Sequence, residues 1–464
     1  MLRRAVVIWV AALAWTGSAC AFSKAEMPLS ADDGTALAAT LYLPDGAVPD
    51  GGWPGILMLH GLGGNRLSMN QIAEQTFANE GYAVLTYDAR GHGSSAGLFT
   101  ADGPREIQDV RNAHAWLAAR VDVADARIGV WGISYGGGAA LGALVEGVPF
   151  AAAEVVETWT DLYGTLVPGG LSKSGAIFAF LNSVSADRTA PEVSALRTSA
   201  LASTNLGALR AFADARSSVA SLGSIRTPTF VFQGRRDFAF GLEQGIATYR
   251  GLGGPKRLYI GAFGHAPSTF PGPDAAQVFT EGSNWFARFL KGLPNGIETR
   301  PPVTLAADPY RELAGAQYRG LPATRTVGFG TPTRRNRISG ARSFTRTFGR
   351  TTRLLETFGA PVVRLTASGT FPHVVVVLKA VTPDGREIVV SEGGAKVRLR
   401  ARPRVVSIRM ISQATTIPRG SRLSLRVGAT SGDLLYLAGV PSRARLDVRR
   451  ITFSLPVLRS PVSG

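Results

Sequence analysis

A serine, an aspartate and a histidine follow one another along the chain in an order that suits covalent catalysis. The serine, Ser134, lies in Gly132-Ile133-Ser134-Tyr135-Gly136, which matches the G-x-S-x-G pattern of a nucleophile on a sharp turn between a strand and a helix. Glycines on both sides allow the neighbouring backbone to come close. An apolar strand-like run, Arg127–Trp131, precedes the pattern, and a helix-like run, residues 137–146, follows it. We therefore expect Ser134 to attack a carbonyl carbon.

A second match to the same pattern needs a different interpretation. Gly93-Ser94-Ser95-Ala96-Gly97 is followed by Asp102-Gly103-Pro104, a turn sequence, before any helix begins. The strand-turn-helix context is missing there. We therefore interpret Ser95 as a loop residue.

A nucleophilic serine needs a base and an acid that orients the base. Among five histidines, only His265 directly follows the last predicted strand of its domain, and Asp237 follows the strand before it. These positions complete the chain order Ser, Asp, His. Glu157 and Asp161, one strand earlier, are the alternative acids. Of the other histidines, His60 is interpreted as a backbone-geometry position at the end of a strand, His92 as a loop residue and His114 as a packing or surface residue, and His373 lies in the basic C-terminal domain.

The developing oxyanion needs two hydrogen-bond donors. The backbone N–H of Tyr135 directly follows the nucleophile and supplies one. The second is expected from the glycine-rich loop His60-Gly61-Leu62-Gly63-Gly64, at the N–H of Leu62, unless that loop is simply a turn. The sequence shows neither metal-ligand spacing nor a phosphate-binding loop, so we predict no metal and no cofactor.

Between residues 27 and 300, strand-length apolar runs alternate with helix-length amphipathic stretches, which is typical of a mostly parallel sheet covered by helices. Runs such as Ile56-Leu57-Met58-Leu59 suit strands that are buried on both faces. This pattern and the placement of Ser134 predict an α/β-hydrolase fold. The predicted strands are Ala36–Leu43, Gly55–Leu59, Tyr82–Tyr87, Arg127–Trp131, Ala151–Glu157, Thr227–Gln233 and Lys256–Ile260.

A long insertion, at about residues 160–226, is rich in Ala, Leu and Ser and has a helical pattern. It is too long for a plain loop, so we expect a helical cap. The cap carries an apolar patch at residues 177–181. We expect Phe178 and Phe180 of this patch to line a substrate pocket that favours acyl or aryl groups.

After Leu293-Pro294-Asn295-Gly296 the pattern changes to short alternating strands separated by turn sequences, such as Thr382-Pro383-Asp384-Gly385. This spacing predicts a β-sandwich. We therefore divide the chain into a signal peptide (1–21), an α/β catalytic domain (22–300) and an all-β, jelly-roll-like domain (301–464).

Positive charge is concentrated in the last third of the chain. Residues 301–464 carry 27 Lys and Arg against 8 Asp and Glu, whereas the whole chain has a net charge of +17. The arginines are spread out and are not interleaved with aromatic residues, which argues against a nucleic-acid platform. They are expected to lie singly on the outer face of strands, with an anionic cell surface as the alternative partner.

The N-terminus has the pattern of an export signal. Arg3 and Arg4 precede the apolar run Ala5–Trp15, and Ala19-Cys20-Ala21 fits a cleavage site. We expect cleavage before Phe22 and a secreted or periplasmic protein, with lipidation of Cys20 or a retained anchor as alternatives. Cys20 is the chain's one cysteine, so the cleaved chain would have no disulfide and no cysteine nucleophile. We predict no transmembrane span after it.

Three motifs of the catalytic domain resemble the cocaine esterase and X-prolyl dipeptidyl-peptidase family of α/β-hydrolases: Leu57–Gly61, Thr86–Gly93 and Trp131–Gly138. Segments 361–366, 382–386 and 417–423 are similar to that family's jelly-roll domain. The resemblance implies a hydrolase that acts on acyl bonds through an acyl-enzyme, with Ser134, Asp237 and His265 at the triad positions. Typical members have a tyrosine donor after the strand on the oxyanion side, where this chain has His60-Gly61-Leu62-Gly63. A backbone donor is expected instead.

Three functions remain open at this point. The first is a carboxylester hydrolase acting on a small-molecule ester. The second is an exopeptidase that releases Xaa-Pro dipeptides from short peptides, with Glu157 and Asp161 as candidates to hold the substrate's ammonium group. The third is a non-catalytic protein that binds a surface through its basic domain.

Overall fold

The computed structural model describes residues 22–312, 315–432 and 435–463. One ten-stranded sheet has the order β1-β2-β4-β3-β5-β6-β7-β8-β9-β10. Strands β4, β3 and β5 to β9 are parallel to one another, and β1, β2 and β10 run antiparallel to their neighbours. The strands are β1 (Phe22–Ser30), β2 (Ala36–Pro44), β3 (Trp53–Leu59), β4 (Ala83–Tyr87), β5 (Val123–Ile133), β6 (Ala152–Val156), β7 (Thr229–Gly234), β8 (Lys256–Gly261), β9 (Val303–Ala306) and β10 (Gly315–Tyr318).

Helices cover both faces of this sheet, and alternate residues of each strand enter the two cores. In β3, Leu57 and Leu59 join the core under α2 and α3, whereas Ile56 and Met58 join the core under α9. This explains why the strand is apolar at every position. The helices of this layer are α1 (Asn70–Ile72), continued by a π-helical turn (Ala73–Ala78), α2 (Pro104–Ala118), α3 (Tyr135–Val145), α8 (Leu242–Gly251) and α9 (Ala275–Leu290).

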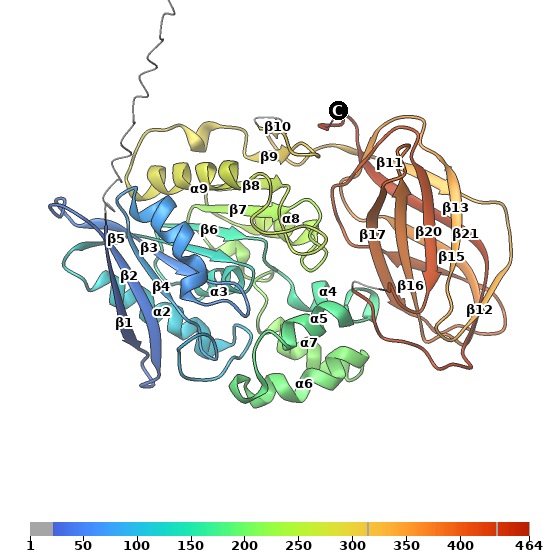
Figure 1. Ribbon diagram of the computed structural model, residues 1–464, viewed down its shortest axis with the longest axis horizontal. Helices are drawn as coiled ribbons and strands as arrows, with labels where there is room; N and C mark the ends of the chain where they lie inside the picture. The colour runs from blue at the N-terminus through green and yellow to red at the C-terminus, as the bar shows by residue number, and fades with distance from the viewer. Residues whose placement is uncertain (1–21, 313–314, 433–434, 464) are drawn as a thin grey trace, which may run out of the picture.

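The insertion after β6 is helical, as predicted. Its helices lie between the carboxyl edge of the sheet and the C-terminal domain (Figure 1). Their inward side chains form a core of their own with residues that follow β4, β5 and β7. The helices are α4 (Leu162–Leu166), α5 (Ser174–Leu181), α6 (Pro191–Ala202) and α7 (Leu206–Asp214).

The C-terminal domain consists of antiparallel sheets with a shared apolar core, which agrees with a β-sandwich. Strand β15 shows the alternation: Val363 and Leu365 are buried, whereas Arg364 points outward. One sheet has the order β11-β21-β15-β18 with β12 beside β21, and the other has β13-β20-β16-β17. The strands are β11 (Thr324–Gly330), β12 (Asn336–Ser339), β13 (Phe344–Arg350), β14 (Leu355–Glu356), β15 (Val362–Gly369), β16 (His373–Val381), β17 (Glu387–Lys396), β18 (Arg404–Arg409), β19 (Thr416–Ile417), β20 (Arg422–Gly428) and β21 (Arg445–Leu458).

The boundary expected at residue 300 differs from the observed topology. Strands β9 and β10 lie beyond it, yet they extend the catalytic sheet at the edge next to β8. The physical reason is the crossover through α9, which returns the chain to the sheet as a further parallel strand. The first strand of the sandwich is β11.

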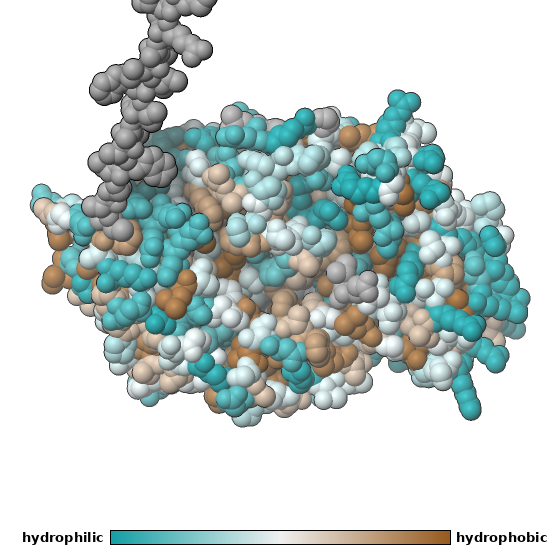
Figure 2. Space-filling model, viewed as in Figure 1, coloured by the Kyte–Doolittle hydropathy of each residue, from teal (hydrophilic) through white to brown (hydrophobic). Residues whose placement is uncertain are grey.

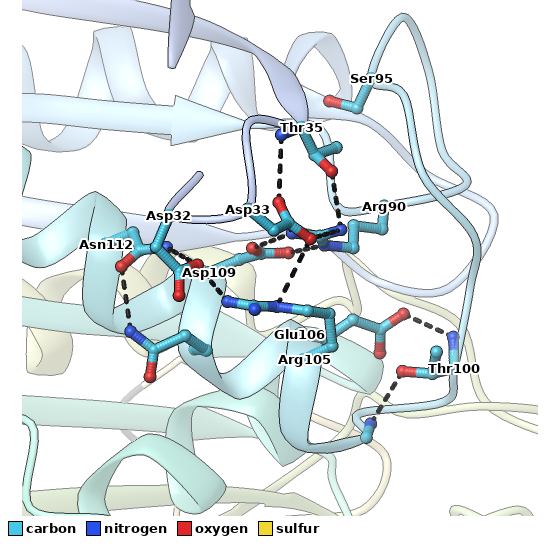
Figure 3. Close-up of polar contacts among 12 residues, drawn as sticks. Asp32, Asp33, Thr35, Arg90, Ser95, Thr100, Arg105, Glu106, Asp109 and Asn112 are labelled. Carbon is cyan, nitrogen blue, oxygen red and sulfur yellow. Dashed lines mark hydrogen bonds and ion pairs between the residues drawn. The ribbon is translucent and has the colours of Figure 1, made fainter. Parts of the chain in front are cut away.

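The motif Asp88-Ala89-Arg90 after β4 has a structural role. Arg90 binds both carboxylate oxygens of Asp109, at 2.5 and 2.8 Å, and also Asp33 at 2.8 Å and Thr35 at 2.9 Å (Figure 3). These contacts join α2, the β1–β2 turn and the loop after β4. No dashed line joins Ser95 to this network in Figure 3, and its Oγ accepts the N–H of Ala38 in strand β2.

Hydrophilic side chains cover much of the sandwich on the face shown in Figure 2. Of the residues described, none belongs to a helix long and apolar enough to cross a membrane. The predicted export signal at residues 1–21 and its cysteine lie outside the described residues.

Candidate active site

The turn that carries Ser134 is strained and closely packed. Ser134 has φ 54° and ψ −114°, a conformation that L-residues rarely adopt, between the end of β5 and the start of α3. A Cβ atom at Gly132 would lie 2.2 Å from the carbonyl oxygen of Gly136, and one at Gly136 would lie 2.2 Å from that of Leu59. Both flanking positions therefore require glycine. The strain is the kind that holds a serine side chain exposed above the sheet.

Hydrogen bonds connect the three predicted residues in series. Ser134 Oγ lies 2.9 Å from His265 Nε2, and His265 Nδ1 lies 2.7 Å from Asp237 Oδ2. Asp237 is fully buried, and its Oδ1 accepts the N–H of Phe240 at 2.8 Å. The structure thus brings together residues from the ends of β5, β7 and β8. This geometry allows the imidazole to take the serine proton while the aspartate fixes its tautomer.

Opposing effects act on His265. Desolvation alone would lower its pKa, but the negative charge of Asp237 and the hydrogen bond to it outweigh this effect and raise the pKa to about 9. The protonated imidazole therefore persists to higher pH than that of a free histidine. Only the neutral imidazole can accept the proton of Ser134.

An alkaline activity profile follows from this shift. We expect kcat/KM for an uncharged ester to rise about tenfold per pH unit on the acidic side and to level off well above pH 6.5, the ordinary histidine value. Initial rates between about pH 5 and 10, corrected for spontaneous ester hydrolysis, measure this. A plateau already reached at about pH 6.5 would contradict the influence of Asp237 on His265.

Glu157 lies beside this triad. It follows β6, has φ 41° and is only 3% exposed. One carboxylate oxygen of Glu157, one of Asp237 and a ring nitrogen of His265 all lie within 4.8 Å of one another. Burial raises the pKa of Glu157 to about 8, and the charge of Asp237 acts in the same direction.

Glu157, Asp237 and His265 also have spacing that a metal ion could use, a feature that sequence spacing did not indicate. The 2.7 Å between His265 Nδ1 and Asp237 Oδ2 is shorter than the roughly 3.4 Å that separates two ligands of a tetrahedral zinc. A hydrogen bond fits this pair better than shared coordination does.

An apolar cavity of about 110 Å³ opens at Ser134 under the cap. This is well above the roughly 10–15 Å³ that a cavity needs to hold one water-sized group. Arg197 is the one charged residue among its described lining side chains. The apolar lining includes Leu62, Trp159, Ile177, Phe180, Leu196 and Phe240.

The two phenylalanines predicted for this pocket differ in position. Phe180 lines the cavity and stacks on Phe240, with ring centroids 5.8 Å apart. Phe178 is 53% exposed and does not line it, so the expectation for this residue was wrong. Residues two apart on a helix point to nearly opposite sides, so both could not face the same cavity. The cavity is instead reached by Ile177 and Leu181.

A second, more polar cavity of about 560 Å³ also reaches Ser134. Leu62 borders both cavities, and Glu157 and His265 line the second one. Tyr135 is the first residue of α3, where helical N–H groups have no partner within the helix. Leu62 and Tyr135 both line the apolar cavity at Ser134.

Residues 33–267, about half of the chain, match the X-Pro dipeptidyl-peptidase (S15) family. The chain belongs to this family. Over nearly its whole length it also has the fold of two solved structures. A CocE/NonD family hydrolase from Staphylococcus aureus has a TM-score of 0.71 at 14% identity and covers 94% of each chain. An alpha-amino acid ester hydrolase has a TM-score of 0.70 at 16% identity and covers 97% of this chain and 98% of its own.

Two curated relatives match this S15-family chain over shorter segments. The quorum-quenching protein AidA of Acinetobacter baumannii is 37% identical over 107 residues, which are 22% of this chain and 33% of AidA. The thiohydrolase aneE of Aspergillus aculeatus is 30% identical over 113 residues, 24% of this chain and 34% of aneE. The chain thus spans about a third of the length of these relatives.

The other histidines and polar candidates of this S15-family protein lie outside the triad. His60 accepts the N–H of Ala89 at 3.0 Å, and burial lowers its pKa to about 4. Asp161 caps α4 by accepting the N–H of Gly164, and it does not line either cavity at Ser134. Ser95 is buried against Asp88 and strand β2.

Sequence reasoning missed Lys173 at the start of α5. Its ammonium group is buried and donates to the carbonyl oxygens of Phe238 and Ala239, both at 2.9 Å. Burial lowers its pKa to about 8. These bonds tie the cap to the loop that carries Asp237. No local pattern marks such a lysine, because its partners are main-chain atoms more than sixty residues away.

Proposed function

We propose that this S15-family hydrolase cleaves carboxylic esters through an acyl-enzyme on Ser134. Ser134 Oγ attacks the ester carbonyl carbon while His265 Nε2 takes its proton, and the proton then passes to the departing alcohol. Water repeats the sequence: it gives a proton to His265, attacks the acyl carbon and releases the acid and free Ser134. Asp237 holds the imidazole tautomer and stabilises the transient imidazolium.

The backbone N–H groups of Leu62 and Tyr135 are proposed to stabilise the oxyanion. Tyr135 donates from the N-terminus of α3, where the helix dipole also favours negative charge. Leu62 borders the same cavity, in a turn closed by the bond from Gly64 N–H to the Gly61 carbonyl oxygen. Preorganised donors of this kind typically contribute 10² to 10³ in kcat each.

The observation that carries the ester assignment is the apolar cavity at Ser134. An aminopeptidase must hold the substrate's ammonium group with a carboxylate, and no described residue lining that cavity is acidic. Glu157 is the one acidic residue among the described residues that line the second cavity, and with its pKa raised to about 8 it stays largely protonated at neutral pH. The cavity therefore favours an uncharged, apolar acyl or aryl group.

A paired assay tests the substrate class. We expect p-nitrophenyl esters to be hydrolysed with kcat/KM at least about 100-fold above that of Gly-Pro p-nitroanilide. Activity should also rise about fourfold per added methylene from acetate to butyrate, because each buried methylene contributes about 0.8 kcal/mol. Faster cleavage of the anilide would instead support the dipeptidyl-peptidase alternative.

A substitution in the cap tests which of the two cavities holds the acyl group of the substrate. Ala200 of α6 lines the cavity, whereas Ala195 of the same helix is exposed. Ala200→Leu should reduce the preference for butyrate over acetate, and Ala195→Leu should leave it unchanged. Equal behaviour of the two variants would place the acyl group in the other cavity.

A further inference from the structure

Three neighbouring strands of the sheet end at the proposed site, and each is followed by a residue whose side chain could take part in catalysis. Ser134 follows β5, Glu157 follows β6 and Asp237 follows β7. Since β6 lies between β5 and β7, the sheet places Glu157 between the nucleophile and the acid. Its φ of 41° is rare for a residue other than glycine, and such strain persists only where the surroundings impose it.

The surroundings of Glu157 do not resemble those of a structural acid. The Glu157 N–H donates to the Phe232 carbonyl oxygen at 2.8 Å, which fixes the backbone. Its Oε2 atom, however, is buried without a hydrogen-bond partner in the described structure. A buried polar atom without a partner is costly, so it needs an explanation. His265 is the basic group within 4.8 Å of this carboxylate.

We propose that Glu157 is a positioning residue that acts as a second acid for His265 and replaces Asp237 when that carboxylate is absent. This inference rests on the proposed function, in which His265 is the base. In the intact site Asp237 holds Nδ1 at 2.7 Å, and Glu157 stays in reserve within 4.8 Å. A shift of about 2 Å by the Glu157 carboxylate would give the imidazole a new acceptor.

The protonation states of Glu157 and Asp237 explain why the two acids do not compete for His265. The charged groups that act on Glu157 are His265 and Asp237, and Lys173 acts in addition on His265. Burial and the negative charge of Asp237 keep Glu157 protonated near neutral pH, so the site does not carry two adjacent charges. Removing Asp237 removes one cause of the raised pKa. Glu157 would then ionise more readily, as a substitute acid must.

The test compares Asp237→Ala with the double variant Asp237→Ala/Glu157→Gln. We expect Asp237→Ala to lower kcat/KM for an ester by about 10- to 100-fold, and the double variant to lower it by roughly 10⁴, the loss typical of a triad without an acid. The matched control is Glu154→Gln in the same background. Glu154 is also a buried glutamate of β6, but it packs against Gly282 of α9, so this change should not add to the loss.

Equally low activity of Asp237→Ala and the double variant, with wild-type activity that still depends on Ser134, would overturn the inference and leave the proposed function intact. Activity that does not depend on Ser134 would overturn both. The pH dependence of the two variants gives an independent readout. In Asp237→Ala the ionised Glu157 should raise the pKa of His265, so the acidic limb of the kcat/KM profile should lie roughly 0.6 to 2.5 pH units above that of the double variant, as expected for a charge within 4.8 Å at dielectric constants of 80 to 20. Identical limbs in the two variants would contradict the proposal.

Discussion

Replacing Ser134 by alanine is expected to lower kcat for a short p-nitrophenyl ester by about 10⁶-fold, as removal of the nucleophile does in the best-studied serine hydrolase. The Oγ atom lies 2.9 Å from the base, on a turn whose conformation serves to expose it. Alanine can adopt the same backbone with no more difficulty than serine. The loss would therefore report chemistry rather than misfolding, and KM should change little.

Covalent labelling tests whether Ser134 is the nucleophile without a measurement of substrate turnover. A fluorophosphonate probe should modify the wild-type protein at Ser134 and should not label Ser134→Ala, as peptide mass spectrometry would show. Ser194→Ala, an exposed serine of cap helix α6, serves as the control and should keep full activity. Residual activity of Ser134→Ala within tenfold of wild type would place the nucleophile elsewhere.

The convergence of Ser134, Asp237 and His265 could be predicted from the sequence because parallel strands impose an order on the chain. Their carboxyl ends meet at one edge of the sheet, so residues that follow successive strands must converge there. The apolar runs before Ser134 and Asp237 located those strands to within a few residues. Their distances were not predictable, because the rotamer of each side chain decides whether a hydrogen bond forms or is missed.

The local sequence pattern could not predict which way a side chain faces or which distant strand a segment pairs with. Phe178 and Phe180 lie in one apolar patch, and only the packed orientation of α5 shows that one faces solvent. Strands β9 and β10 are only four residues each and follow the expected boundary, but they pair with the catalytic sheet. The position of Glu157 after a strand made it a possible acid, but only the structure shows that its carboxylate lies near His265.

A buried ion pair at the domain junction gives the largest expected effect on stability. Arg235, two residues before Asp237, donates to Glu356 Oε1 at 2.5 Å and to the Ala306 carbonyl oxygen at 2.5 Å. Both side chains are nearly inaccessible, at 2% and 0% exposed. Glu356 Oε2 also accepts the N–H groups of Val462 and Ser463. The pair thus joins the acid-bearing loop to the sandwich and the C-terminal segment.

Glu356→Ala should lower the free energy of unfolding by about 3–5 kcal/mol, because it leaves the Arg235 guanidinium buried without a counterion. Urea unfolding followed by tryptophan fluorescence measures this, and Arg335→Ala is the control. Arg335 is half-exposed where it pairs with Asp447, so its loss should cost less than about 1 kcal/mol.

The double variant Arg235→Met/Glu356→Leu separates the cost of an unpaired charge from lost packing. It removes both charges while filling the space, so it should regain the part of the stability lost in Glu356→Ala that is due to the unpaired Arg235 charge, whereas the N–H groups of Val462 and Ser463 stay without Glu356 as their acceptor. Its ester activity should still fall, because Arg235→Met removes the side-chain bond to the Ala306 carbonyl oxygen that helps to hold the segment just before Asp237. A variant that recovers stability but not kcat would show that the sandwich contributes to catalysis by holding the acid in place. Full recovery of both would make the junction purely structural.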